Sequence, residues 1–430
     1  MRFSTLGDWL RWQEGLHPWA IDLGLDRVGT VARRLGVDRT GARVITVGGT
    51  NGKGSTVAYL EAILQASGHR PGAYTSPHLQ RYNERIRIAG QEATDEAIIA
   101  AFEAVDQARS DITLTYFEFG TLAALYLLRA AQCDIWLLEV GMGGRLDAVN
   151  ILDADVAVLT NVQLDHTDWL GHDRASIGRE KAGIMRPGRP VILGSADMPR
   201  SVTEQAARLG SEPRSLRRDF DFGRQARADH WWWRGCSAHW QELPLPGLAG
   251  RHQLANAAAA LAALEALGEP VARWESAARR VLPQVQLAGR QQWVAGPPDW
   301  LLDVAHNAAA AARLAVRLRT IPVQGQIRCI FGLLRRKDLD GVAAPLLALV
   351  DQWYLLELPD GDAWPAAQIA AHLLARGARI AAAGATDEVL ARVRCESGID
   401  DCIVAFGSFR VVAEVMRELP PARLPVANVR

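Results

Sequence analysis

The stretch VITVGGTNGKGSTVAYLEAIL, from Val44 to Leu64, decides the fold of the region around it. An apolar segment is followed by a glycine-rich turn and then by apolar residues at helical spacing, so we predict a strand, a loop and a helix. Such a loop directs backbone N–H groups and the positive end of the helix dipole to one point, where phosphate oxygens bind. Lys53 would add a positive charge, and Ser55 or Thr56 a hydroxyl group. The sequence therefore predicts a nucleotide phosphate-binding loop.

The spacing of this loop is not the standard one. The standard pattern would require glycine at position 47, where Val47 stands, and Gly54 separates Lys53 from Ser55. The alternative interpretation is a glycine-rich turn with an incidental lysine. The order of strand, turn and helix favours the phosphate-binding loop. The shorter loop narrows the choice of family.

Length and composition predict a soluble two-domain chain. The 430 residues are 49% apolar, and domains usually contain roughly 100 to 200 residues. Lys plus Arg and Asp plus Glu both number 48, so we expect neither nucleic acid nor a membrane as a partner. The five cysteines show no paired or metal-ligand spacing, which fits a reduced compartment. Since no signal-peptide core or membrane-spanning run is found, we expect an unprocessed cytoplasmic protein. We also expect a monomer.

Two segments flanking the loop have open interpretations. Asp22, in the turn IDLGL, is either a helix cap or a polar contact for a ligand. Residues 72–90, GAYTSPHLQRYNERIRIAG, bring His78 and several arginines close together, among them Arg85. Such a segment is either a solvated loop or a carrier of hydroxyl and basic groups to an anionic ligand.

Polar side chains follow two further predicted strands. Glu139 lies near the end of an apolar strand from Ile135 to Val140, and His166 follows the strand DVAVLTNV. Ligand sites of open parallel sheets lie beyond the carboxyl ends of the strands. A buried carboxylate requires a cation or hydrogen bonds, so we interpret Glu139 as a metal ligand and His166 as a candidate ligand, although Mg²⁺ prefers oxygen. Lys181, on a predicted helix, is by itself a surface salt-bridge residue.

The segments between these strands and the domain boundary have weaker patterns. Residues 94–132 are mostly helical, with an interruption at DITLTYFEFG. Residues 200–247, which contain three consecutive tryptophans, predict a small sheet insertion rather than an aromatic nucleotide platform. Asn256 lies near the start of an alanine-rich helix, where its amide either caps the helix or contacts a base or ribose.

The last third of the chain predicts a second α/β domain. Proline and glycine residues concentrate around Gln286, so we divide the chain into domains 1–285 and 286–430. Beyond this point LLDVAHN, IRCIFG, QWYLLEL and CIVAFGSF are apolar strands separated by helical stretches. They predict a doubly wound, Rossmann-like unit. It lacks the GxGxxG pattern, which argues against a dinucleotide cofactor.

These features together indicate ATP held between two domains. The phosphate loop, Glu139 and His166 belong to the first domain, and Asp303 and His306 end the first strand of the second. A kinase, an ATP-hydrolysing motor, an ATP-dependent ligase and a non-catalytic ATP-binding module are all compatible with this arrangement. A motor is disfavoured because no motor-specific pattern is visible.

Seven motifs in a fixed order identify a family. GGTNGKGST, YTSPH, LTYFEFGT, EVGMGGRLDA, LDHTDWLG, REKAGI and DVAHN resemble the folylpolyglutamate synthase and dihydrofolate synthase family of Mur-type ligases over nearly the whole chain. The resemblance implies a P-loop-containing central domain of the Mur ligase type, domain 1–285, and a C-terminal Rossmann-like glutamate-ligase domain, 286–430.

The activity that this resemblance implies is an acid–amino-acid ligase reaction. L-glutamate is joined to 7,8-dihydropteroate, which forms dihydrofolate, and to the γ-carboxyl group of reduced folates. ATP converts each acid to an acyl phosphate before the amine attacks, and domain closure excludes water. A folylpolyglutamate synthase without the first activity is the near alternative, and a small-molecule kinase is a remote one.

The resemblance also implies roles for individual residues. Lys53, Lys181 and His166 would be catalytic. The expected ATP contacts are Thr50, Asn51, Gly52, Lys53, Gly54, Ser55, Asn256, Arg290 and Asp303. The expected dihydropteroate contacts are Asp22, Leu23, Gly24, Thr115, Leu146, Asp147 and Ala148. Two Mg²⁺ ions would be held by Ser76, Glu139, His166 and Lys181, the last as a carbamate, and this replaces the salt-bridge interpretation of Lys181.

The sequence departs from the family pattern in two places. The linker usually carries Pro-Gly-Arg, whereas this chain has Ala288, Gly289 and Arg290, followed by Gln291 where an apolar residue is common. A histidine often precedes the Lys-Asp pair in the C-terminal domain, where this chain has Arg336. The first departure predicts a looser hinge, and the second leaves the glutamate-binding residues unassigned.

Overall fold

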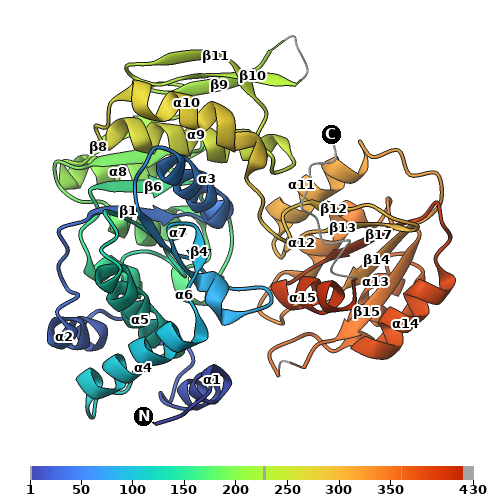
Figure 1. Ribbon diagram of the computed structural model, residues 1–430. Helices are drawn as coiled ribbons and strands as arrows, with labels where there is room; N and C mark the ends of the chain where they lie inside the picture. The colour runs from blue at the N-terminus through green and yellow to red at the C-terminus, as the bar shows by residue number, and fades with distance from the viewer. Residues whose placement is uncertain (1, 226–228, 360, 420–430) are drawn as a thin grey trace. The chain divides into compact units, whose positions relative to one another are not determined.

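The computed structural model describes residues 2–225, 229–359 and 361–419. The chain forms two compact units. Unit 1 comprises Met1–Pro246 and His252–Val285, and unit 2 comprises Gly247–Arg251 and Gln286–Arg430. In Figure 1, unit 2 is drawn mainly in orange and red. Each unit has a hydrophobic core of its own.

Unit 1 is built on an 8-stranded sheet with the order β4-β3-β2-β5-β1-β6-β7-β8. The strands from β2 to β8 in this order are parallel, while β3 and β4 are antiparallel additions at one edge. Because β1 lies between β5 and β6 and all three are parallel, the loops that follow these strands are neighbours at the carboxyl ends of the strands. The strands predicted from Val44, from Ile135 and in DVAVLTNV are therefore confirmed as β1, β5 and β6. The bounds are β1 (Arg43–Gly48), β2 (Pro71–Tyr74), β3 (Ile86–Ile88), β4 (Gln91–Glu92), β5 (Ile135–Glu139), β6 (Val156–Leu159), β7 (Pro190–Leu193) and β8 (Glu212–Ser215).

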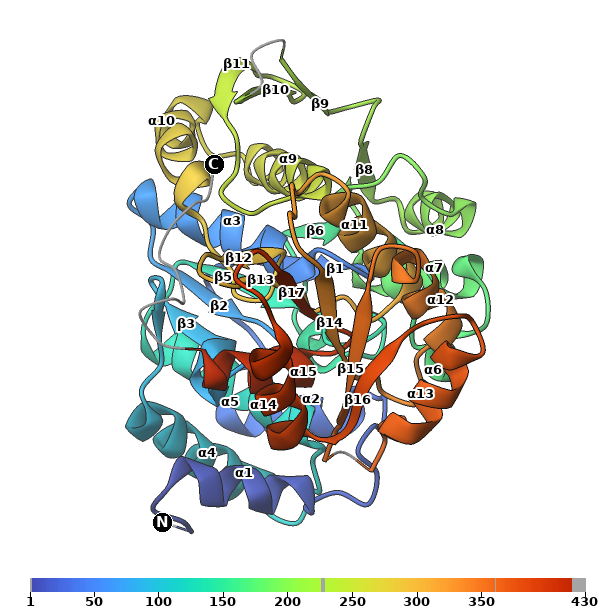
Figure 2. The same ribbon diagram turned by 90° about the vertical axis from the view of Figure 1, so that its right-hand side faces the viewer.

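Helices cover both faces of this sheet (Figures 1 and 2). Their bounds are α1 (Leu6–Glu14), α2 (Asp26–Leu35), α3 (Lys53–Ala66), α4 (Asp95–Arg109), α5 (Tyr116–Ala130), α6 (Thr167–Leu170), α7 (Arg174–Lys181), α8 (Arg200–Leu209), α9 (Arg251–Ala266) and α10 (Val271–Val281). Short 3₁₀ turns are η1 (Tyr82–Arg85), η2 (Ala148–Ile151), η3 (Ala182–Ile184) and η4 (Leu282–Gln284). Apolar side chains of α1, α2, α4, α5, α7 and α8 share one core with the strands.

Helix α5 begins inside the segment predicted to interrupt the helical region. The hydroxyl group of Thr115 accepts a hydrogen bond from the backbone N–H of Glu118, at 3.2 Å, and the Glu118 carboxylate accepts one from Thr115 N, at 2.8 Å. This capping box satisfies two backbone donors that the first turn would leave free. The interruption therefore ends at Thr115, and YFEFG is helical.

The predicted small sheet is confirmed and packs on two helices. Strands β9 (Asp221–Arg224), β10 (His230–Arg234) and β11 (His239–Pro244) form an antiparallel sheet, which lies over α9 and α10 in Figure 1. Trp233 donates its indole N–H to the carbonyl of Ala258 in α9, at 3.2 Å. The rings of Trp240 and Trp274 have centroids 4.7 Å apart. These tryptophans therefore anchor the insertion to the rest of unit 1.

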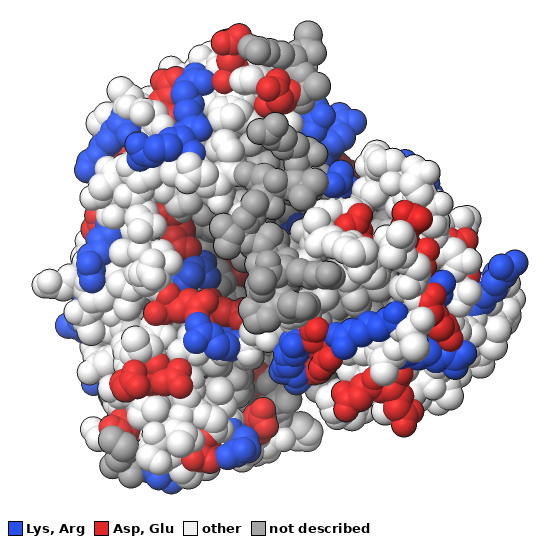
Figure 3. Space-filling view, turned by 45° about the vertical axis from the view of Figure 1, so that its right-hand side comes forward, with Lys and Arg blue, Asp and Glu red and all other residues white. Residues whose placement is uncertain are grey.

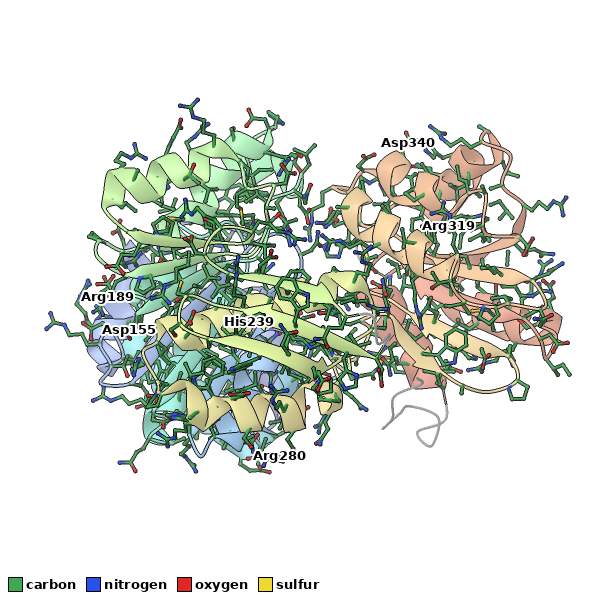
Figure 4. The ribbon with its side chains drawn as sticks, turned by 90° about the horizontal axis from the view of Figure 1, so that it is seen from above. Asp155, Arg189, His239, Arg280, Arg319 and Asp340 are labelled. Atoms are coloured by element: carbon green, nitrogen blue, oxygen red, sulfur yellow. The ribbon has the colours of Figure 1, made fainter. Side chains whose placement is uncertain are left out.

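Polar contacts fix the ends of β1 and α3 at the sheet edge opposite the predicted site. Asp155 accepts a hydrogen bond from Val44 N, at 2.8 Å, and pairs with Arg189 at 3.2 Å; Asp155 and Arg189 are labelled in Figure 4. Arg280 of α10, labelled in the same view, donates to the carbonyl of Ala66 at the end of α3, at 3.2 Å. A cationic side chain at a helix C-terminus satisfies free carbonyls and complements the dipole.

Unit 2 is a Rossmann-like α/β unit on a 6-stranded sheet of order β12-β13-β17-β14-β15-β16. All neighbouring strands pair in parallel except β12 and β13, which are antiparallel. The four predicted strands are confirmed, while β12 and the alanine-rich β16 were missed. The strands are β12 (Gln292–Val294), β13 (Asp299–Leu302), β14 (Ile327–Phe331), β15 (Gln352–Glu357), β16 (Ile380–Ala385) and β17 (Cys402–Phe406). The helices are α11 (Ala308–Leu318), α12 (Leu339–Ala343), α13 (Ala366–Leu374), α14 (Thr386–Glu396) and α15 (Phe409–Glu418), with the 3₁₀ turn η5 (Ala344–Leu346).

Charged side chains of both signs are interspersed on the face shown in Figure 3. This distribution fits the equal numbers of acidic and basic residues. Among the helices of the described residues, none combines the length and the apolar composition that crossing a bilayer would require.

A buried ionic network holds the middle of the unit 2 sheet. Arg328 of β14 donates through Nε to Asp401, at 2.7 Å, and through Nη1 to the hydroxyl group of Tyr354, at 2.7 Å. Asp401 also accepts from Gln326 N, at 2.7 Å. Burial raises the pKa of Asp401, but the hydrogen bonds from Arg328 and from backbone N–H groups outweigh it and lower the pKa below its ordinary value. Asp401 therefore stabilises unit 2 in its ionised form.

We predict that Asp401→Asn destabilises unit 2 at pH 7 by about 3 to 5 kcal/mol, because it leaves the Arg328 charge buried without its counter-charge. Since the pKa of Asp401 is lowered in the folded state, its contribution is present above about pH 4 and is lost as the pH falls further. The difference between wild type and variant should shrink correspondingly below that pH. Hydrogen exchange of the β14 and β17 amides measures the stability of unit 2 in wild type and variant, at pH 7 and at lower pH.

The matched control is Asp362→Asn, which removes an exposed pair with Arg336, at 2.8 Å. An exposed pair contributes at most about 1 kcal/mol. Equal losses in the two variants, or a loss in Asp401→Asn that does not change with pH, would contradict the assignment of the network.

Candidate active site

The phosphate-binding loop is held in place by the residues that follow β6. Thr50 N donates to the carbonyl of Asn161, at 2.9 Å, and Asn51 N donates to the Asn161 side chain, at 3.1 Å. The hydroxyl group of Thr160 and the Asn161 amide both donate to the carbonyl of Asn51, at 2.8 and 2.7 Å. These contacts fix the path of the backbone between β1 and α3. None of them can be read from the loop sequence.

Two glycines of the loop have no room for a side chain. Gly49 has a φ of +137°, and a Cβ atom there would lie 1.9 Å from the Thr160 hydroxyl oxygen. Gly52 has a φ of +91°, and its Cβ atom would lie 2.4 Å from Oδ1 of Asn256. Positive φ values and such close approach are compatible only with glycine. Asn256 lies within α9 rather than at its start, so of the two predicted roles the helix cap is wrong.

Two lysines converge on a single carbonyl of this loop. Lys53 donates through Nζ to the carbonyl oxygens of Gly49, at 3.2 Å, and of Thr50, at 3.3 Å. Lys181, which is buried at the end of α7, donates to the carbonyl of Gly49 at 3.0 Å. A surface salt-bridge role for Lys181 is therefore wrong. The two ammonium groups and the N-terminus of α3 concentrate positive charge where the sequence predicts phosphate binding.

Gln253 joins the helix after the loop to α9. Its Nε2 atom donates to the hydroxyl oxygen of Ser55, at 3.3 Å, and its Oε1 atom accepts from Asn256 Nδ2, at 2.9 Å. All three side chains are buried. The sequence placed Ser55 and Asn256 near a nucleotide but missed Gln253, which lies one helical turn before Asn256 and orients its amide. Gly54 is the second residue of α3.

Glu139 and Ser76 meet at the ends of adjacent parallel strands. Glu139 ends β5 and is buried, and its Oε2 atom accepts a hydrogen bond from Ser76 N, at 3.2 Å. The register of the two strands explains this meeting, because Tyr74 of β2 pairs with Leu138 of β5. The predicted location of Glu139 at a strand end is confirmed.

His166 follows β6 and is the residue before α6. It has a φ of +52°, and its backbone N–H donates to the carboxylate of Asp165, at 2.8 Å. The Nε2 atom of His166 lies 3.9 Å from the same carboxylate. A left-handed conformation is uncommon for a residue with a Cβ atom and marks a locally constrained turn.

The predicted metal ligands supply a mixed donor set. Ser76 offers a hydroxyl, Glu139 a carboxylate and His166 an imidazole, on loops that follow β2, β5 and β6. Within residues 2–225, 229–359 and 361–419, no three His, Cys, Asp or Glu side chains are grouped closely enough to hold a metal ion. Mg²⁺ commonly takes one or two carboxylates and completes its shell with water and substrate phosphates. The donors present fit that kind of site, beside a phosphate-binding loop.

The predicted dihydropteroate residues lie in three places: the turn that carries Asp22, Thr115 at the start of α5, and the residues around Asp147. Hydrogen bonds through Arg27 and Glu118 connect the first two. Asp22, Leu23 and Gly24 lie in the turn between α1 and α2. Leu25, not Asp22, is the residue that precedes α2, so the helix-cap interpretation of Asp22 is wrong. The Asp22 carboxylate pairs with Arg27, at 2.6 Å, and Arg27 also reaches Glu118 in the first turn of α5, at 3.1 Å.

The third place surrounds the buried carboxylate of Asp147. Asp147 follows Leu146, precedes Ala148 in η2, and accepts hydrogen bonds from Met142 N, at 2.8 Å, and Val149 N, at 3.1 Å. Burial raises its pKa to about 6, opposed by those hydrogen bonds and by the positive charge of Lys53. Asp147 therefore links the phosphate-binding loop electrostatically to the predicted acid-substrate site.

One arginine of the segment 72–90, Arg85, lies in a buried and partly aromatic environment. Arg85 is buried, donates to His78 at 2.8 Å, and lies 5.3 Å from the Tyr82 ring centroid and 5.6 Å from that of Tyr116. The solvated-loop interpretation is therefore wrong for Arg85. Contacts with aromatic faces stabilise a cation with few hydrogen-bond acceptors.

In unit 2, Arg290 and Asp303 lie close together at the end of β13. Asp303 accepts a hydrogen bond from Ala305 N, at 2.8 Å. Burial raises the pKa of Asp303 to about 6, opposed by that hydrogen bond and by the charges of Arg290 and Arg313. The Arg290 guanidinium lies 5.0 Å from the ring centroid of Phe409. The sequence analysis did not identify Arg313, which lies in α11 just after the DVAHN motif, or Phe409, which begins α15 and is distant from that motif along the chain.

A phosphate-binding α/β unit followed by a Rossmann-like unit without a dinucleotide motif is the layout of Mur ligases. Residues 47–264 match the model of the Mur ligase middle domain, and residues 289–409 match that of the Mur ligase glutamate ligase domain. The chain is 44% identical to the dihydrofolate synthase/folylpolyglutamate synthase of Escherichia coli strain K12 over 98% of this chain and 97% of that protein. The chain therefore belongs to the dihydrofolate synthase/folylpolyglutamate synthase family.

Solved structures of this family match the whole fold. E. coli FolC in complex with DHPP and ADP has a TM-score of 0.91 and 43% identity, covering 96% of this chain and 97% of that one. The bifunctional folylpolyglutamate synthase/dihydrofolate synthase with Mn, AMPPNP and L-glutamate bound has a TM-score of 0.89 and 43% identity, covering 96% of this chain and 98% of that one.

We predict that Gly49→Ala lowers the free energy of unfolding by more than about 2 kcal/mol, because the new methyl group would overlap the Thr160 hydroxyl and break its bond to Asn51. Gly188→Ala is the matched control. Gly188 also has a positive φ, of +63°, but no atom lies within 4 Å of its Cβ position, so the loss there should be about 1 to 2 kcal/mol. Urea denaturation followed by circular dichroism compares the two. A loss in Gly49→Ala no larger than in Gly188→Ala would contradict the crowding around Gly49.

Proposed function

We propose that this chain is an ATP-dependent ligase that joins L-glutamate to 7,8-dihydropteroate and to the γ-carboxyl group of reduced folates. The observation that carries the proposal is the convergence of Lys53 and Lys181 on Gly49 of the phosphate-binding loop, in a chain similar along its length to bifunctional relatives. The structures of similar proteins with ADP or AMPPNP, Mn, and L-glutamate or DHPP support these ligand classes.

The first step activates a poor electrophile. A carboxylate oxygen of the acid substrate attacks the γ-phosphorus of ATP, the bond to the β-phosphate oxygen breaks, and ADP leaves with an acyl phosphate remaining. Both reactants are anions, so positive charge has to be in place before they meet. Lys53, the backbone N–H group of Gly52 and the N-terminus of α3 would supply that charge. Asn256 would contact the nucleoside.

The second step forms the amide. The amine nitrogen of L-glutamate attacks the acyl carbon and loses a proton, and inorganic phosphate leaves with the oxygen that came from the carboxylate. Water competes with the amine for the acyl phosphate, so the site has to exclude it. Phe117, at the start of α5, packs against Gly141. A Cβ atom added to Gly141 would lie 2.6 Å from the Phe117 ring. Because the Gly141 backbone also hydrogen-bonds Asp147, this contact packs protein against one of the acid-substrate residues.

Divalent metal would be held at the strand ends. Ser76, Glu139 and His166 are the proposed ligands, together with Lys181 after its amine has combined with CO₂ and released a proton to give a carbamate anion. When bound, the metal screens the triphosphate charge. Unmodified Lys181 donates to Gly49 O, which already places its Nζ atom beside the phosphate-binding loop.

The proposal predicts products with both acids. With ATP, Mg²⁺ and L-glutamate, mass detection should show glutamylated product from 7,8-dihydropteroate and from tetrahydrofolate, and ADP release should require both the acid and glutamate. Turnover of tetrahydrofolate alone would leave a folylpolyglutamate synthase without the first activity. A stable phosphorylated acid formed without any amine acceptor would identify a kinase and overturn the ligase.

We predict that Lys181→Ala lowers kcat by about 100-fold or more, the scale for removing one preorganised charged group. Acetate should restore part of the activity, because its carboxylate can occupy the space of the carbamate. Lys181→Arg is the control for charge, since arginine keeps the cation and does not form a carbamate. Wild-type rates in Lys181→Ala, or full activity in Lys181→Arg, would contradict the carbamate.

A further inference from the structure

The Asp22 carboxylate is held through one of its two oxygens. Oδ2 lies 3.1 Å from Nε2 of His17 and 2.6 Å from Nη1 of Arg27. Among the contacts of the described residues, none reaches Oδ1, and 35% of the Asp22 side chain is exposed. One oxygen is therefore fixed by protein groups, and the other is available for a hydrogen-bond donor from outside the chain.

His17 connects Asp22 to the segment before α5. Its side chain is only 8% exposed, and its Nδ1 atom lies 2.9 Å from the hydroxyl oxygen of Thr113. A neutral imidazole satisfies both contacts when the Thr113 hydroxyl donates to Nδ1 and the Nε2–H group donates to Asp22. The two contacts together fix the orientation of the ring.

Arg27 makes a second connection between the same two segments. Its Nη2 atom donates to the backbone carbonyl of Asp22, at 2.8 Å, and to Oε1 of Glu118, at 3.1 Å. The other carboxylate oxygen of Glu118 accepts from Thr115 N, at 2.8 Å. The turn that carries Asp22 and the helix start that carries Thr115 are thus tied by His17 and by Arg27.

We propose that His17 is a positioning residue for the acid substrate: it holds the Asp22 carboxylate with Oδ1 presented to the N–H groups of the dihydropteroate heterocycle. The inference rests on the proposed function, which assigns Asp22 and Thr115 to dihydropteroate. A carboxylate whose rotamer is already fixed loses less conformational entropy when it accepts a ligand hydrogen bond. The loss of His17 should therefore weaken binding of this substrate and leave the other substrates unaffected.

The test uses His17→Ala and His17→Gln in the full chain. Kd for 7,8-dihydropteroate is measured by calorimetry with AMPPNP present, and KM is measured for every substrate. His17→Ala should raise Kd and KM for dihydropteroate roughly tenfold, the lower end for a hydrogen bond to a charged group. KM for ATP and glutamate should stay within about twofold. His17→Gln should restore most of the loss, because its Nε2 atom can replace the imidazole donor.

Thr113 provides a second pair of variants at an exposed position, where folding is not at risk. Thr113→Val removes the hydroxyl group and should shift Kd in the same direction as His17→Ala, while Thr113→Ser keeps the hydroxyl and should not. His69→Ala is the control for loss of a paired, mostly buried histidine. His69 lies 2.9 Å from Asp134 and 3.8 Å from Glu269, beside the start of β2 at the opposite edge of the sheet. It should leave Kd for dihydropteroate unchanged.

Several results would overturn the positioning role. The first is an unchanged Kd for dihydropteroate in His17→Ala. The second is a rise of KM for ATP and glutamate equal to that for dihydropteroate. The third is a His17→Gln variant that binds dihydropteroate no better than His17→Ala. If the wild type binds dihydropteroate without turning it over, the proposed function fails, and the positioning role stands provided that His17→Ala weakens binding. If the wild type does not bind dihydropteroate at all, both are overturned.

Discussion

The site depends on one constraint, the crowding around the carbonyl of Gly49. This carbonyl accepts hydrogen bonds from Lys53 and Lys181 at 3.2 and 3.0 Å, while the other side of Gly49 lies against Thr160. A side chain at Gly49 would displace Thr160, and with it the hydroxyl that holds Asn51. The glycine, the loop path and the positions of the two lysine side chains are therefore a single arrangement.

The sheet topology explains why other polar groups collect around that arrangement. β1 is flanked by β5 and β6, so Glu139, which ends β5, and Asn161, which follows β6, lie on either side of the strand that leads into the phosphate-binding loop. Asp147 precedes the 3₁₀ turn η2, and Asp303 follows β13. Both accept backbone hydrogen bonds, and burial raises the pKa of each to about 6. Above that pH both are mainly ionised, and each then carries a negative charge close to an arginine or lysine of its own unit.

The sequence predicted those parts of the structure that local rules determine. The strand, loop and helix around Lys53, the strand ending in Glu139 and four strands of unit 2 all follow from apolar periodicity and glycine placement. The start of α5 could also have been predicted, since Thr115 and Glu118 have the spacing of a capping box. β16 could not have been predicted, because the alanine-rich IAAAGA has no strand-like alternation.

The missed residues act across long stretches of chain. Asn161 contacts the phosphate-binding loop from a position 110 residues away, and Gln253 reaches Ser55 over 198 residues. His17 meets Thr113 across 96 residues. Such partners are fixed by the order of strands in the sheet, which a single sequence does not specify. Lys181 is a further example, because its helix alone indicates a surface residue and only the sheet buries it beside Gly49.

The most direct test of ligation through an acyl phosphate follows an oxygen atom. With 7,8-dihydropteroate labelled with ¹⁸O in its carboxylate, unlabelled ATP and L-glutamate, the account predicts transfer of one carboxylate oxygen to inorganic phosphate in every turnover. Mass spectrometry of the released phosphate measures that transfer. Phosphate formed at the same rate as amide product but without label would contradict the account, because the carboxylate would then never have attacked the γ-phosphorus.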